Sequence, residues 1–244
     1  MRSSPKIIAL KRPHFAPKRQ FQGFWQRLVA TIYVMMTEMG RRQFFHTAIA
    51  GAALLAAPST ATDIIFTPGT GTAGAGLSPL LLGRAKAAME LHRSRVRNRE
   101  LLAIADFSKP SRDPRFYLVN LQTGQSTTLL VAHGKGSDPA HSGWVQSFSN
   151  IPGSEATSSG SFIVGDAYIG EHGASRRLIG LDAQNDQAEA RAIVIHPAWY
   201  VSQSIAAEQG KLGRSQGCFA FSQNDIGQVL DRLAPGTLLY ADKV

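Results

Sequence analysis

The stretch Gly213-Arg214-Ser215-Gln216-Gly217-Cys218-Phe219-Ala220-Phe221 contains the single cysteine of this 244-residue chain. The thiol follows a glycine-containing turn and precedes an apolar, strand-like run, a placement that can present a sulfur atom at the mouth of a pocket. A thiolate is nucleophilic at ordinary pH once a neighbouring group lowers the pKa of the thiol. Cys218 is therefore either a catalytic nucleophile or a small buried apolar residue, as most unpaired cysteines are.

The positive charge of the chain lies in its first 61 residues. The formal net charge is +9, but residues 1–61 hold nine of the 26 basic residues and one of the 17 acidic residues. The rest of the chain is thus close to neutral. A basic surface for nucleic acid is not expected, because the charge that would suggest it belongs to residues 1–61.

Residues 1–61 have the pattern of an export signal. Arg41 and Arg42 stand directly before two phenylalanines, and residues 47–57 form an uncharged run rich in alanine and leucine. As a helix this run would rise about 16 Å, roughly half a bilayer core, so it is an h-region and not a membrane span. The small residues at 57–61 offer a cleavage point. The arginine pair fits the twin-arginine type of signal, which predicts a periplasmic or cell-envelope protein that meets the membrane only during export.

Residues 1–35 contain no acidic residue and precede a cluster of methionines at Met35, Met36 and Met39. Either the start is assigned too early or the n-region is unusually long. An exported protein with one cysteine cannot form an internal disulfide, which favours a reactive thiol or an intermolecular bridge.

The remaining chain reads as one domain of mainly β structure. Residues 62–78 are rich in glycine and threonine and indicate a flexible linker, and residues 79–98 have a helical pattern. Short apolar runs then predict eight strands, at 101–107, 116–121, 127–133, 161–164, 178–181, 192–196, 218–221 and 237–240. One further helix is expected at 223–233 with Ser222 as its N-cap. The prediction is a β-sandwich or open barrel over residues 79–244, with one or two short helices and a preceding N-terminal helix.

Two other features bear on function. Residues 134–160 are polar and glycine-rich, which is typical either of a functional loop or of a mobile surface excursion. The apolar strand at 192–196 ends in His196, followed by Pro197. His196 is either a core histidine or a base that accepts the Cys218 proton. No Asp or Asn stands out to orient its ring, so a backbone carbonyl such as that of Pro197 would have to do so.

Several blocks resemble one known family in their order along the chain. They are residues 131–137, 148–150, 158–162, 168–173, 191–196 and 213–218. This order is similar to that of L,D-transpeptidase catalytic domains, in particular the murein branch of the YkuD-like cysteine transpeptidases, and it covers residues 101–242. Two positions depart from the common pattern: Gln216 stands where many members have histidine, and Phe219 where proline or a small residue is frequent.

The resemblance implies an exported cysteine acyltransferase that acts on peptidoglycan stem peptides through a Cys thioester and releases D-Ala. Carried over by position, Cys218 is the nucleophile and His196 the base, while Ser215 and Gly217 shape the turn and the oxyanion site. It places five residues on the substrate side: Arg214, Tyr168, His172, His133 and Ser137. It implies no cofactor and no metal, and carbapenem-type compounds are expected as inhibitors.

Three alternatives remain open. Water instead of an amine would make the enzyme an L,D-carboxypeptidase or endopeptidase on the same site. A chain that keeps the fold without activity would be a cell-wall-binding module. A zinc hydrolase using His133, His141, His172 and His196 has weak support, because the histidines lack a helical ligand spacing.

Overall fold

The computed structural model describes residues 71–72 and 76–244. The predicted leader at 1–61 lies outside the described residues, as does most of the predicted linker at 62–78. Its described part belongs to the fold: β1 (Gly71–Thr72) pairs with the strand that contains Ser126, and Ser78 caps the first described helix. No described helix is long and apolar enough to cross a bilayer.

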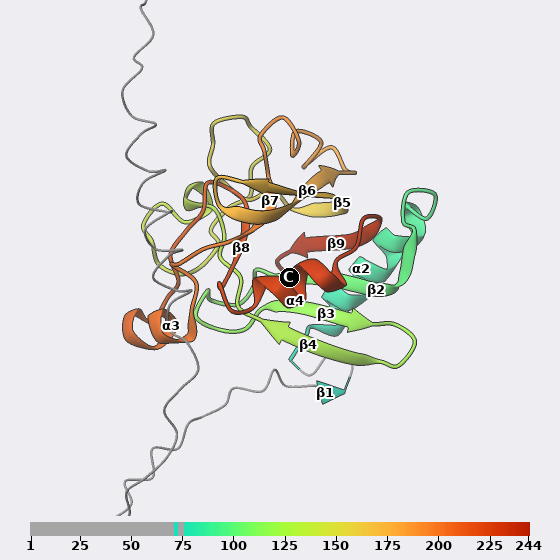
Figure 1. Cartoon of the computed structure of the whole chain (residues 1–244), viewed down its shortest axis with the longest axis horizontal. Coiled ribbons are helices and arrows are strands. Elements are labelled where there is room, and N and C mark those ends of the chain that lie inside the picture. Colours follow the sequence, from blue (N-terminus) through green and yellow to red (C-terminus); the bar gives the residue numbers. More distant parts are fainter. Residues whose placement is uncertain (1–70, 73–75) are drawn as a thin grey trace, which may run out of the picture. The chain divides into compact units, whose positions relative to one another are not determined.

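The described strands form one nine-stranded sheet in the order β1-β4-β3-β2-β9-β5-β6-β7-β8 (Figure 1). The bounds of the remaining strands are β2 (Asn98–Asp106), β3 (Phe116–Asn120), β4 (Gln125–Leu129), β5 (Gly160–Gly170), β6 (Gly173–Gly180), β7 (Val194–Pro197), β8 (Phe219–Phe221) and β9 (Thr237–Asp242). The pairs β2–β9 and β7–β8 are parallel, and the other neighbours are antiparallel.

The two ends of this sheet approach each other. Directly after β4, Ala132 forms an antiparallel bridge with Ala220 of β8, which is the opposite edge strand. Two residues later Gly134 bridges Ser215 in parallel. The sheet therefore curls into a partly closed barrel, and the prediction of a mainly-β fold is confirmed in its open-barrel form.

Both faces of the central strands are buried. Along β2, Leu101, Ala103 and Ala105 join the cluster inside the curl, while Leu102 and Ile104 face the outside. This follows from the period of two in a strand, and it explains why β2 is apolar without alternation.

Helix α2 (Pro79–Leu91) covers the outer face of β2 (Figure 1). Its buried residues Leu81, Ala85 and Met89 pack on the outer side of the sheet. The helix ends earlier than residue 98 because the N–H groups of Arg97 and Asn98 donate to the Gly236 carbonyl and draw the chain toward the sheet.

Two short helices complete the fold. Helix α4 (Ile226–Arg232) lies within the predicted range 223–233, but its N-cap is Asp225 and not Ser222. The Ser222 hydroxyl instead accepts the Asp225 N–H at 3.0 Å in the turn before the helix. Helix α3 (Gln203–Gln209) was not predicted, since seven residues are too few to show a helical period. The Ser202 hydroxyl caps it by accepting the Ile205 N–H at 3.1 Å, and Gly210 ends it with φ +67°.

Candidate active site

Cys218 lies at the end of a tight turn, immediately before β8. The Ser215 hydroxyl donates to the Cys218 carbonyl at 2.7 Å and accepts the Gly217 N–H at 3.2 Å. Gly217 has φ +116°, and a Cβ there would come within 2.7 Å of Ile193 Cδ1. Only glycine fits this conformation and this space, so the sequence Ser-x-Gly-Cys determines how the thiol is presented.

The loop after β4 supports the turn from behind. The Ser215 N–H donates to the His133 carbonyl at 2.9 Å, and the Lys135 N–H donates to the Ser215 carbonyl at 2.8 Å. A Cβ on Gly134 would come within 2.7 Å of Gly217 Cα. This part of residues 134–160 is therefore a packed support of the site.

His196 reaches the same side of the sheet from β7. The parallel register pairs Ile195 with Phe219 and His196 with Ala220. Since Ile195 and Phe219 point into the core, His196 and Cys218 both lie on the opposite face. The ring nitrogen Nδ1 of His196 is 2.8 Å from the Pro197 carbonyl. A carbonyl can only accept, so Nδ1 carries the proton and Nε2 is the basic nitrogen.

The environment keeps His196 neutral. Burial lowers the pKa of His196 in spite of the opposing effect of the hydrogen bond to Pro197, and the neighbouring His172 lowers it further. The two rings stack with centroids 4.4 Å apart and planes inclined by 28°. His172 comes from the tip of the β5–β6 hairpin, where Gly170 pairs with Gly173.

These groups line one pocket of about 500 Å³. Its lining residues are Tyr168, Glu171, His172, Arg191, Ala192, Val194, His196, Tyr200, Arg214, Ser215, Gln216 and Cys218. Six of the sequence-predicted site residues are among them. The turn residue Gly217 lies behind the lining, where its N–H is already bonded to Ser215. Within the described chain, the N–H groups of Gln216 and Cys218 have no hydrogen-bond acceptor, so these two donors are available to a ligand.

The Cys218 thiol is held in its neutral form. Burial raises its pKa, while a backbone hydrogen bond from Val194 and the charge of Arg191 act in the opposite direction. The thiol donates to the Ala192 carbonyl, with the sulfur 3.5 Å from the oxygen. Among the described hydrogen bonds none joins the sulfur to His196, so proton transfer between them requires the thiol to turn away from Ala192.

Two arginines bring positive charge to the pocket. Nη1 of Arg214 donates to the Asp138 carbonyl and, at 3.2 Å, to the Pro139 carbonyl. Within the described residues neither Arg214 nor Arg191 forms an ion pair with a carboxylate. Their charges are therefore free to act on an anionic ligand or on a thiolate.

The structure does not bring His133 and Ser137 to the pocket, although both were expected on the substrate side. Both are fully buried. The Ser137 hydroxyl accepts the Thr157 N–H at 3.0 Å. His133 accepts a hydrogen bond from Arg115 at Nδ1, at 2.7 Å, and its Nε2 is 3.5 Å from a carboxylate oxygen of Asp138. Burial and the charge of Arg115 lower the pKa of His133 to about 3. These residues hold the supporting loop.

Sequence reasoning gave no role to Arg191, Glu171 or Tyr200, which also line the pocket. The first two stand inside the blocks 191–196 and 168–173 that resemble the family, but a position in a motif does not show what a side chain faces. The four histidines considered as zinc ligands are not gathered at one site, since His133 is buried and His141 bonds to the Leu212 carbonyl. No cluster of three or more metal-binding side chains occurs in the part of the chain that the structure describes.

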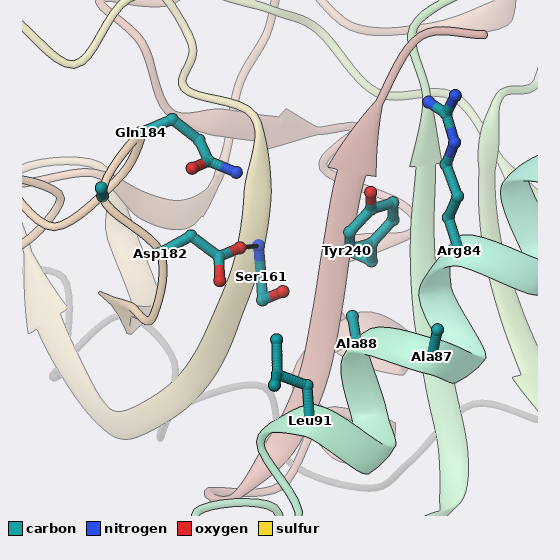
Figure 2. A pocket seen from close by; sticks show the side chains of 9 residues that line it. Arg84, Ala87, Ala88, Leu91, Ser161, Asp182, Gln184 and Tyr240 are labelled. Atoms are coloured by element: carbon teal, nitrogen blue, oxygen red, sulfur yellow. Dashed lines mark hydrogen bonds between the residues drawn. The ribbon is translucent and has the colours of Figure 1, made fainter.

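A second hollow of about 640 Å³ lies between α2 and the loop after β6 (Figure 2). Asp182 lies on the loop side of this hollow and Arg84 and Leu91 on the α2 side, and Tyr240 of β9 lies between Asp182 and Arg84. Asp182 accepts the Ser161 N–H at 2.6 Å. The residues that line this hollow include no thiol or imidazole, so the nucleophile and base belong to the Cys218 pocket.

A family model identifies the family to which this site belongs. The family model described as "L,D-transpeptidase catalytic domain" matches residues 75–241. A search of curated proteins found no match. Among solved structures, an L,D-transpeptidase from Mycobacterium tuberculosis H37Rv is 12% identical over 59% of this chain and 57% of that chain, with a TM-score of 0.37. An L,D-transpeptidase from Mycobacterium smegmatis is 15% identical over 59% and 58%, with a TM-score of 0.36.

A third solved structure is L,D-transpeptidase 3 from Mycobacterium tuberculosis in complex with a faropenem-derived adduct. It is 11% identical over 59% of this chain and 60% of that chain, with a TM-score of 0.37. The chain thus spans less than two thirds of the length of each of these structures. Because the identities and TM-scores are low, the family assignment rests on the match to residues 75–241.

Proposed function

The chain belongs to the family of L,D-transpeptidase catalytic domains, and from this premise we propose that it is an exported cysteine acyltransferase acting on peptidoglycan stem peptides. The observation that carries the proposal is that His196 on β7 and Cys218, immediately before the parallel strand β8, line one pocket. The Pro197 carbonyl fixes the His196 tautomer that leaves Nε2 free to accept a proton.

In the first half-reaction the S–H bond of Cys218 breaks and its proton passes to Nε2 of His196. The thiolate attacks the carbonyl that precedes a terminal D-alanine, and the C=O electron pair moves onto the oxygen. The N–H groups of Gln216 and Cys218, which have no acceptor within the described chain, are placed to bond this oxyanion. One such donor commonly stabilises the transition state by about 3 kcal/mol. Collapse forms the thioester, and His196 gives its proton to the departing amine of D-alanine.

In the second half-reaction the acyl group passes to an amine of a neighbouring stem. The incoming amine loses a proton to His196, the new amide forms, and the thiolate leaves and is protonated again. Arg214 is proposed to meet the substrate carboxylate. Its Nη1 is held by two backbone carbonyls, and no described carboxylate neutralises its charge.

Hydrolysis is the second candidate activity, because water can attack the same thioester in place of an amine. Purified protein from residue 62 onward is incubated with sacculi, and the muropeptides are analysed. Transfer predicts cross-linked dimers and released D-alanine. Trimmed monomers without dimers would establish the carboxypeptidase or endopeptidase reaction instead. A cell-wall-binding module predicts that wild-type protein and Cys218→Ala leave the muropeptides equally unchanged.

The covalent step has a direct test with a carbapenem. The β-lactam carbonyl is a strained amide beside a carboxylate, so it presents the thiolate and Arg214 with the same two groups as the proposed substrate. We expect an adduct of one carbapenem per chain by intact mass, and none on Cys218→Ala. Folded wild-type protein that acquires no adduct would contradict Cys218 as an acylated nucleophile.

A further inference from the structure

The Cys218 thiol needs help to ionise. Burial raises its pKa. The Ala192 carbonyl accepts a hydrogen bond from the thiol, with the sulfur 3.5 Å from the oxygen, which also favours the neutral thiol. His196 offers no charge in the resting state, because burial and His172 lower its pKa and keep it neutral near pH 7. A resting thiolate–imidazolium pair is therefore not favoured, and a positive charge that does not titrate is needed beside the sulfur.

The titratable groups that face this pocket come from three parts of the fold. They are Tyr168, Glu171 and His172 of the β5–β6 hairpin, Arg191 and His196 before and on β7, and Tyr200 and Arg214 from the segments on either side of α3. Position 216, inside the nucleophile turn, is a glutamine and carries no charge. A permanent charge can come only from the arginines of this lining.

Arg191 is held by neutral acceptors alone. Its Nη1 donates to the Ser149 carbonyl at 2.6 Å and to the Ser158 hydroxyl at 2.7 Å, and its Nη2 donates to the Ser154 hydroxyl at 3.2 Å and to the Ala156 carbonyl. These contacts fix the guanidinium group without neutralising it. No described carboxylate pairs with it.

The backbone places this fixed guanidinium against the nucleophile turn. Nη2 of Arg191 lies 3.4 Å from the position that a Cβ on Gly217 would occupy. The next residue, Ala192, has φ +52°, a conformation that residues with a Cβ rarely adopt and that is often maintained at functional sites. That conformation directs the Ala192 carbonyl at the sulfur while Arg191 lines the same pocket.

We propose that Arg191 supplies the fixed positive charge that stabilises the Cys218 thiolate when the thiol proton moves to His196. In this step the S–H bond of Cys218 breaks and an N–H bond forms at Nε2 of His196, with no other reactant. Arg191 acts on the sulfur through its charge. This proposal rests on the proposed function only for the use that is made of the thiolate.

The test is the pH dependence of Cys218 alkylation by iodoacetamide, which needs no peptidoglycan. Arg191→Gln is expected to raise the thiol pKa by about one pH unit, and Arg191→Lys, which keeps the charge, by less. Arg176→Gln is the matched control, because Arg176 is also half-buried and donates to the Leu230 carbonyl, but does not line the pocket. It should leave the thiol pKa unchanged.

An unchanged thiol pKa in folded Arg191→Gln would overturn the proposal, as would equal shifts in the Gln and Lys variants, which would mean that Arg191 acts by packing. If Arg191→Gln does not fold, the wild-type thiol is titrated at low and high salt. Screening of an unpaired cation in an open pocket raises the thiol pKa, and no rise with salt counts against the proposal. A normal Arg191 effect without acyl transfer would instead refute the proposed function alone.

Discussion

The proton on the His196 ring is placed by a single backbone carbonyl. With Nδ1 bonded to Pro197, Nε2 is the nitrogen that must be unprotonated for catalysis. Burial and His172 lower the pKa of His196, so the ring stays neutral to a lower pH than an exposed histidine. We therefore expect the acidic limb of kcat/KM for a stem peptide to lie below pH ~6.5, the ordinary histidine value.

Initial rates from mildly acidic to neutral pH measure this limb. His196→Gln should abolish turnover while the fold persists. An acidic limb at or above the ordinary histidine pKa would mean that the base is another group or that His196 is more exposed in solution.

At the scale of single residues, the sequence predicted those features of the site that a local pattern indicates. A strand that ends in His196 before a proline, and a cysteine behind a Gly turn, are short-range features, and the Pro197 carbonyl does lie at His196 as expected. Arg191 was missed because its acceptors come from about forty residues earlier; the bond to Ser149 spans 42 residues. His133 was expected on the substrate side from the family resemblance alone, but tertiary packing buries it.

Among the elements, the β5–β6 hairpin decides how the pocket is bounded. Tyr168, Glu171 and His172 at its end form one wall. Replacing Glu171 by Asn and His172 by Gly gives a two-residue loop that such hairpins favour and removes two of the three side chains of this wall. We expect kcat/KM for stem peptides to fall about tenfold, mainly through KM, as the loss of one good contact implies. Iodoacetamide should alkylate Cys218 at least as fast as in the wild type.

The control is Asp166→Ala, an exposed residue of the same hairpin that does not line the pocket. It should leave both rates unchanged. Slower alkylation in the tip variant would show that the hairpin supports the nucleophile itself and not only the substrate.

The elements that sequence patterns missed share one physical property. The outer half of β5, at residues 165–170, and its partner in β6 are mostly exposed or half-buried and mix small, polar and apolar residues, so no apolar alternation indicates them. They are strands because each pairs with the other across Gly170 and Gly173. By contrast, β2 and β9 were predicted because they lie in the centre of the sheet, where both faces are buried.

For the molecule as a whole, a group of buried polar side chains lies where the curled sheet closes. His133 follows Ala132, the residue after β4 that bridges to β8, and its ring lies between the buried side chains of Arg115 and Asp138. Its backbone carbonyl holds Ser215 of the nucleophile turn. The stability of the fold and the geometry of the site are thus joined at one residue, whose ionisation would place a second positive charge beside Arg115.

Acid should therefore weaken the whole fold before it protonates His133. In the unfolded chain His133 binds a proton near pH 6.5, whereas in the fold its pKa is lowered to about 3. The unfolded state binds more protons between these values, so the free energy of unfolding falls as pH falls, by up to about 1.4 kcal/mol per pH unit. The accumulated loss at pH 5 is about 2 kcal/mol.

Urea unfolding at several pH values measures the slope. His133→Asn, whose side-chain oxygen can still accept from Arg115, is expected to be less stable at pH 7 but to lose less stability on acidification. Equal slopes in the two proteins would show that His133 does not carry this dependence.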